Sequence, residues 1–205
     1  MHRKYKFKDG DDENQVITET TYFQRVFSQL HTFSREKLKR GQMDHVGVVL
    51  FNSQDTDNKW NLESCKTQIP LQELNKQAID QLSEIASGNK TGKAHDKMVE
   101  SATDRSHLDL ALWCCTNIFN DSLEKNARKG IYILTCNDDI LGDSFSGARA
   151  DKKKETATDQ CLQRVKDSVE KGILIDVWPL QDADSLVDDG PMPPAFKSSP
   201  FYQKL

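Results

Sequence analysis

The chain has 205 residues, of which 36% are hydrophobic and 29% charged, and its formal net charge is −4. This length suits one domain with a core of ordinary size. No apolar run approaches the roughly 20 residues needed to cross a bilayer, and no apolar segment typical of a secretory signal follows the basic first residues. A nucleic-acid-binding domain that acts alone usually carries a basic excess, which this chain lacks.

The sequence contains five cysteines, an odd number. Most of them lie inside apolar helix or strand patterns, where buried free thiols are common. These are Cys114, Cys115, Cys136 and Cys161. We therefore expect a reducing compartment, the cytosol or the nucleus.

The first part of the chain alternates polar and apolar segments. Residues 1–15 are charged and aperiodic, which predicts a tail or loop. Over residues 17–39, apolar residues recur at three- and four-residue spacing, which predicts an amphipathic helix that stops at Gly41. The apolar run over residues 45–51 predicts a strand, and residues 52–64 a polar loop.

A second strand and helix follow this loop. Residues 67–74 are expected to form an edge strand, because Pro70 has no backbone N–H to donate. Asn75 is suited to cap a helix that ends at Gly88. Residues 89–106 are polar and predict a long connection.

The centre of the chain pairs an almost wholly apolar helix with an apolar strand. Residues 108–119 have no polar stripe, so we expect this helix to be covered on most sides. Residues 130–136 form an apolar run without alternation, which is typical of a parallel strand buried on both faces. Residues 137–139 then stand where ligands usually bind in an open α/β sheet, or they merely close the strand.

The last part of the chain repeats the pattern. Residues 138–154 predict a polar loop, and residues 155–171 a helix that stops at Gly172. Residues 173–178 predict the last inner strand, and residues 181–200, acidic and then proline-rich, an excursion or linker. Apolar strands that alternate with helices specify an α/β fold, a mostly parallel sheet with helices on both faces.

The sequence does not match the motifs for catalysis or cofactor binding that we compared with it. The segment 88–94 is similar to a phosphate loop, but its glycine spacing is one residue short, Ala94 replaces the magnesium-binding hydroxyl, and it follows a helix. No Gly-x-Gly-x-x-Gly run follows a strand. Cys114 and Cys115 are adjacent on a helix and point about 100° apart, so they make a poor redox or chelating pair. We predict no cofactor.

Folds of the von Willebrand factor A type suggest one possible metal site. They hold a divalent ion with an Asp-x-Ser-x-Ser run, a later Thr and a further Asp, the oxygen ligands that hard cations prefer. Asp138 is placed to supply the last of these ligands, and Thr103 or Ser106 the second. Because the Asp-x-Ser-x-Ser run is absent from the sequence, we predict no metal site, with Asp138 as the candidate ligand if there were one.

Four segments in order resemble the amino-terminal domain of Ku. The order of a Leu-Gln-Glu-Leu run, a Leu-Trp pair and an asparagine-rich strand end is most similar to the seventy-kilodalton subunit. The likeness runs from about residue 16 to 205. It is carried by residues 45–51, 69–74, 112–121 and 131–139, and continues through residues 147–152, 176–180 and 201–202.

The resemblance implies a von Willebrand A-like domain, expected over residues 16–205, at the periphery of a nuclear heterodimer. In that family the heterodimer threads onto double-stranded DNA ends and acts in non-homologous end joining and telomere maintenance. The implied partners are the second Ku subunit, DNA ends and end-joining repair factors, without a membrane. The family is associated with helicase and end-processing activities, but no phosphate loop is present here, so we predict a scaffold and no enzyme.

The chain departs from the family pattern in two ways. The family's first strand, the middle of its sheet, should precede residue 1, and its β-barrel should follow residue 205, so we expect a piece of a longer protein. Without the first strand, residues 46–51 and 131–136 would face each other with unpaired backbone groups, unless residues 4–8 form a substitute strand. The lysine linked in the family to removal of abasic sugar remnants also lies upstream, and no residue here takes its role.

Basic residues ahead of the last predicted helix are the candidate contacts to DNA or a partner. They are Arg149, Lys152, Lys153 and Lys154. A solvated loop is the alternative interpretation. The basic cluster over residues 35–40 lies at the end of a predicted helix, where cations complement the helix dipole.

The alternative function is a von Willebrand A-like adaptor that captures a protein near Asp138 without DNA, and a doubly wound enzyme comes third.

Overall fold

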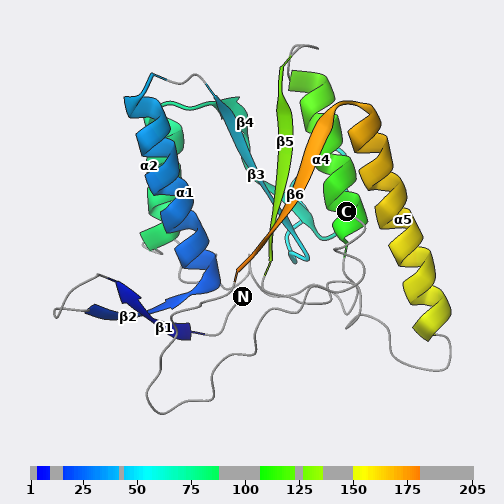
Figure 1. Cartoon of the computed structure of the whole chain (residues 1–205), viewed down its shortest axis with the longest axis horizontal. Coiled ribbons are helices and arrows are strands. Elements are labelled where there is room, and N and C mark those ends of the chain that lie inside the picture. The colour runs from blue at the N-terminus through cyan, green and yellow to red at the C-terminus, as the bar shows by residue number, and fades with distance from the viewer. Residues whose placement is uncertain are drawn as a thin grey trace.

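The structure is a computed structural model that describes residues 4–9, 16–41, 44–87, 107–122, 127–135 and 150–180. In these ranges six strands and four helices form three separate two-stranded sheets with helices around them (Figure 1). In chain order the elements are β1 (Lys4–Asp9), β2 (Val16–Thr21), α1 (Tyr22–Lys39), β3 (His45–Phe51), β4 (Cys65–Glu73), α2 (Lys76–Ser87), α4 (Leu108–Ser122), β5 (Lys129–Thr135), α5 (Ala150–Glu170) and β6 (Ile173–Pro179).

The start of the chain corrects two predictions. Residues 4–9 are a strand, and β1 pairs with β2 in antiparallel register, so the loop predicted for 1–15 is wrong there. The alternation of polar and apolar residues in β1 and the β-branched residues of β2 favour strands. The first helix begins at Tyr22 and not at residue 17, because Thr21 and Gln24 form a capping box. In it Gln24 N donates to Thr21 Oγ1 at 3.2 Å, and Thr21 N to Gln24 Oε1 at 3.1 Å.

The β3–β4 pair is packed on both faces. The pair is antiparallel, and a bulge leaves Gln68 unmatched between the Val48–Ile69 and Val49–Thr67 pairs. A bulge changes which face the following side chains point to. Ile69 accordingly packs with Phe23 and Phe27 of α1, together with Leu82 of α2. At the other end of β4, Cys65 is fully buried near Cys114 of α4.

Two predictions about β4 and the helix that follows it are confirmed, the edge position of the strand and the cap at Asn75. Within the described residues β4 pairs only with β3, so it is the predicted edge strand. Asn75 caps α2 as expected, because Asn75 Oδ1 accepts a hydrogen bond from Ala78 N at 2.9 Å.

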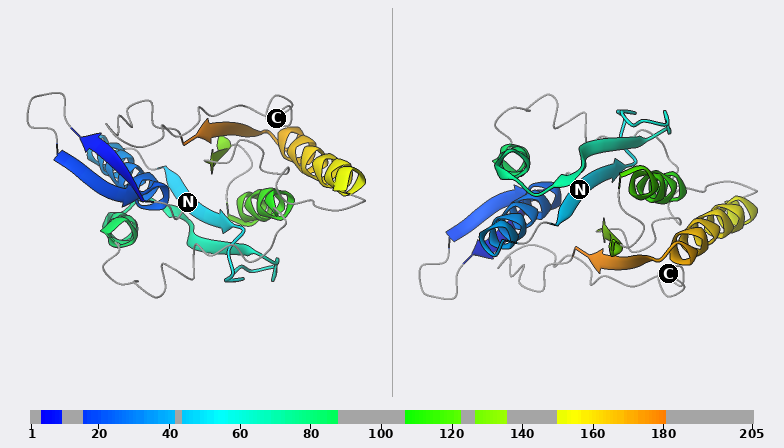
Figure 2. Two further views of the ribbon diagram at one scale, coloured as in Figure 1. Left: turned by 90° about the horizontal axis from the view of Figure 1, so that it is seen from below. Right: turned by 90° about the horizontal axis from the view of Figure 1, so that it is seen from above.

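The β5–β6 pair is parallel and is packed on one face. The inner face joins α4 and α5 in one core cluster of Leu108, Leu112, Ile131, Ile133, Cys161, Val165 and Ile173. On the outer face Tyr132 is 56% exposed, Leu174 76% and Trp178 50%. The prediction that the β5 strand is buried on both faces is therefore wrong. Figure 2 shows the reason, because α4 and α5 lie together on the same side of this pair.

The predicted gap in the sheet is present. β3 pairs with β4 and β5 with β6, and no described strand lies between the two pairs. β1 does not fill the gap, because it pairs with β2. Helix α4 connects the halves instead, since it contacts β3, β4 and α5. The predicted von Willebrand A-like α/β class is confirmed, with its middle strand missing from the sheets.

No described helix is long and apolar enough to span a bilayer.

Candidate functional site

Hydrogen bonds connect the described residues at the carboxyl ends of the strands to neighbouring elements. Asn52, which follows β3 with a left-handed φ of 58°, accepts a bond from His107 N at 2.9 Å through its side-chain oxygen. This bond connects the end of β3 to the start of α4. Beyond β6, Leu180 N donates to Thr135 O at 2.7 Å. The predicted site residues of this edge, Asp138 with Thr103 or Ser106, lie outside the described residues.

The described residues contain no cluster of three or more His, Cys, Asp or Glu side chains suited to a metal ion. The cysteines around α4 are free thiols. Burial raises the pKa of Cys65 and of Cys115 to about 12, and it also raises the pKa of Cys114. Since the thiolate is the nucleophile and the metal ligand, these thiols are inert near neutral pH. The interpretation of Cys114 as a core residue is confirmed, and Cys115 is partly buried against a core cluster.

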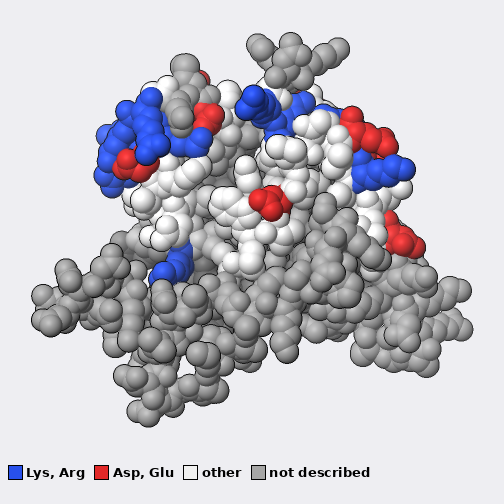
Figure 3. All heavy atoms as spheres, viewed as in Figure 1, with Lys and Arg blue, Asp and Glu red and all other residues white. Residues whose placement is uncertain are grey.

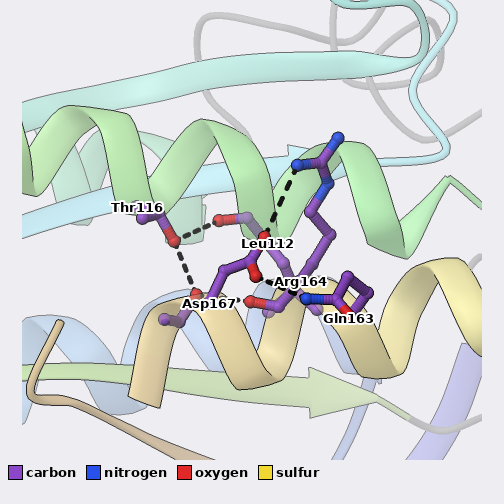
Figure 4. A network of polar contacts seen from close by, with 6 residues as sticks. Leu112, Thr116, Gln163, Arg164 and Asp167 are labelled. Carbon is purple, nitrogen blue, oxygen red and sulfur yellow. Dashed lines mark hydrogen bonds and ion pairs between the residues drawn. The ribbon is translucent and has the colours of Figure 1, made fainter. Parts of the chain in front are cut away.

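Two buried hydroxyls lie between α4 and α5 (Figure 4). Thr116 Oγ1 and Ser168 Oγ are 2.7 Å apart, and each also lies within 2.9 Å of a carbonyl oxygen one turn earlier in its own helix, of Leu112 and of Arg164. Each hydroxyl has one proton, so one of the two must donate to the other while its partner donates to a carbonyl. Because hydroxyl and carbonyl groups are not general bases, this contact joins two helices and does not activate a nucleophile.

Basic side chains gather at the C-terminal end of α1, as Figure 3 shows for one face of the molecule. Lys37 forms an ion pair with Asp44, and Lys39 with Glu36 at 2.8 Å. The hydrogen bond from Lys39 lowers the pKa of the exposed Glu36 carboxyl. The cluster thus lies where cations complement the helix dipole, as predicted.

Three of the four candidate contact residues lie at the start of α5. The helix begins at Ala150, so the loop predicted for residues 150–154 is wrong there. Lys152, Lys153 and Lys154 occupy consecutive positions in the first turns, about 100° apart around the helix axis. Arg149 lies outside the described residues.

One group of side chains was missed by sequence reasoning. Asp176 on β6 is held by two hydrogen bonds, from Val177 N to Oδ1 and from Trp178 Nε1 to Oδ2, both at 2.9 Å. The ring of Trp178 also contacts the ring of Tyr132, the residue paired with Asp176, with centroids 4.9 Å apart. The available signal was Asp176 itself, a carboxylate inside an otherwise apolar strand.

The described elements form a domain of the von Willebrand A-like α/β class, and the described residues contain no cluster suited to a metal ion. The model of one family, the Ku70/Ku80 N-terminal alpha/beta domain, matches residues 12–190. The chain therefore belongs to the Ku N-terminal domain family. No curated protein matches the chain. Membership implies a non-catalytic domain of a DNA-end-binding heterodimer, formed with a partner Ku subunit.

Proposed function

We propose that this chain is the amino-terminal domain of the seventy-kilodalton Ku subunit, and that it serves as a scaffold in non-homologous end joining and telomere maintenance in the nucleus. The observation that carries the proposal is the family match over residues 12–190. The order of segments that resembles this subunit supports the choice between the two subunits. The domain is proposed to span residues 16–205, with β1 attached ahead of it, and end-joining repair factors are the proposed further partners.

Within this function we propose that Lys152, Lys153 and Lys154, with Arg149 before them, contact DNA phosphates or an acidic partner. Their position in α5 supports this role. The amino-terminal end of a helix carries a partial positive charge that attracts anions, and lysines there strengthen the attraction to a phosphate or a carboxylate. A net charge of −4 for the whole chain agrees with a domain that makes few phosphate contacts.

The experiment compares linear with closed circular duplex DNA, using the full-length protein in complex with its partner Ku subunit. We expect binding to linear DNA that weakens with salt, and little binding to the circles. Equal binding to both forms would reject the DNA-end function and favour the adaptor that acts without DNA.

The lysines are tested in the same assay. Changing Lys152, Lys153 and Lys154 together to Ala should lower the slope of log affinity against log salt by about 0.9 for each phosphate that the variant no longer binds. The matched control changes Lys166 and Lys171 to Ala, two exposed lysines near the other end of α5. If the control and the triple variant behave alike, the three lysines make no specific contact, whereas the end-binding function would stand.

A further inference from the structure

We propose that the outer face of the β5–β6 pair docks a segment of a partner protein that presents an arginine side chain within an apolar surface. The outer face is defined by Tyr132, Leu134, Leu174, Asp176 and Trp178. The proposal goes beyond the scaffold function and does not rest on it, because it depends only on the packing and charge of this face.

The parallel register arranges these side chains in one strip. Tyr132 is paired with Asp176, Leu134 with Trp178, and Gly130 with Leu174. A Cβ atom at Gly130 would lie 3.5 Å from the ring of Tyr132, an ordinary van der Waals contact, so this ring lies over Gly130. That ring is therefore close to the sheet between Leu174 at one end and Trp178 at the other. The result is a nearly continuous apolar strip that stays exposed in the folded chain.

The composition of the strip is typical of a protein interface. Tyr and Trp are the residues most enriched among those that carry binding energy, and burying one such ring removes roughly 150–250 Å² from water. Of the described helices, α4 and α5 pack on this pair of strands, and both lie on its inner face. Figure 3 shows that the surface over β6 is largely uncharged, apart from acidic atoms near its centre.

Asp176 determines which partner fits. Its two oxygens each accept one hydrogen bond within β6, which fixes the carboxylate and leaves each oxygen with capacity for another. Among the described residues no Lys or Arg lies within ion-pair distance of it. A carboxylate that is covered by an apolar partner needs a compensating charge. The partner must therefore bring a cation.

The flanking rings favour arginine over lysine. A guanidinium group is planar, bonds both oxygens of a carboxylate, and stacks on aromatic faces, whereas an ammonium group is a compact and strongly hydrated charge. The rings of Tyr132 and Trp178 are inclined by 55°, and the fixed carboxylate is bonded to the indole of Trp178 and belongs to the residue paired with Tyr132. A guanidinium group satisfies the carboxylate and the ring faces at once.

The test uses synthetic amphipathic helical peptides, rich in Leu and Ala, with one central position of the apolar face changed. That position carries Arg, Lys or citrulline, the uncharged isostere of Arg. Binding to the full chain is followed at the indole N–H signal of Trp178 by NMR, assigned with Trp178→Phe. We expect the Arg peptide to bind at least about tenfold more tightly than the citrulline peptide, with the Lys peptide between them.

Variants separate the charge from the apolar contact. Asp176→Asn should reduce the ratio between Arg and citrulline peptides to about one, and the matched control Asp159→Asn, at an exposed position of α5, should leave it unchanged. Leu174→Ala should weaken both peptides equally. Equal affinities in the wild type, a ratio that survives Asp176→Asn, or no binding at all would overturn the proposal. Concentration-dependent dimerisation abolished by Trp178→Ala would also overturn it, in favour of a second copy of this chain. DNA-end binding should be the same in all these variants.

Discussion

The β3–β4 pair and the β5–β6 pair, which we call the two halves, both contain apolar strand sequences but are covered differently. The β3–β4 pair lies between α1 and α2 on one side and α4 on the other, and its bulge directs Ile69 and Cys65 to different layers. Among the described helices, those that pack on the β5–β6 pair lie on its inner face alone. An apolar run thus determines that a strand forms, whereas the positions of the helices decide how many of its faces are buried. The exposed face is then available for another molecule.

Substitution of an aromatic residue in each half should give the largest difference. Phe27 is 2% exposed in the core between α1 and β4, so Phe27→Ala should lower the free energy of unfolding by about 3–5 kcal/mol. Tyr132→Ala on the outer face should cost about 1 kcal/mol or less, because more than half of this side chain is already in water. Urea unfolding followed by circular dichroism measures both. Equal losses would mean that the two halves are equally buried.

The pH dependence of the free energy of unfolding tests how deeply the Cys65 thiol is buried where β4 packs against α4. Burial raises the pKa of Cys65 from 9.0 to about 12, so the folded state holds the thiol proton more tightly than the unfolded state. This contribution to stability is complete below about pH 9 and is lost as the pH rises through the folded pKa near 12. One thiol changes the slope by at most about 1.4 kcal/mol per pH unit.

Cys65→Ala isolates this effect from other groups that titrate in alkali. Its free energy of unfolding should depend less steeply on pH between 9 and 12 than that of the wild type, as measured by urea unfolding at each pH. Identical slopes would show that the Cys65 thiol titrates normally in the folded chain. The difference below pH 9 should be constant, since it reports only the change in packing.

Much of the fold was predictable from the sequence, and the parts that were not have physical reasons. The apolar runs of β3, β5 and β6 and the cap at Asn75 were found, because periodicity and capping are local signals. The missing strand between β3 and β5 was found through the family resemblance. Coverage of the outer face was predicted wrongly, because burial depends on elements distant in sequence.

The candidate site was less predictable than the fold. The aromatic residues beside Asp176 come from two strands that are far apart in the sequence, and their approach depends on the parallel register of Tyr132 with Asp176. Sequence spacing carries no such information. The basic residues 152–154 were noticed as a run, but the helix start at Ala150 was missed, and their contacts stay a prediction.

The contact between α4 and α5 should give an intermediate effect in the β5–β6 half. Thr116→Val removes one hydroxyl and keeps the shape, and should cost about 1 kcal/mol, as should Ser168→Ala. The double variant should cost less than the sum, by about 0.5–1 kcal/mol, because the two hydroxyls share one bond. A double-mutant cycle in urea measures this coupling. Strict additivity would mean that each hydroxyl bonds only the carbonyl in its own helix.

The smallest effect is expected at the most exposed apolar residue of the outer face. Leu174 is 76% exposed on β6, so Leu174→Ala should change the free energy of unfolding by no more than about 0.5 kcal/mol. Leu112→Ala on α4, where the side chain is 1% exposed, is the matched control and should cost about 2–5 kcal/mol. Both are measured by urea unfolding of the same chain. A loss at Leu174 close to that at Leu112 would mean that the outer face is covered within the chain itself, and no partner protein would then be needed to bury it.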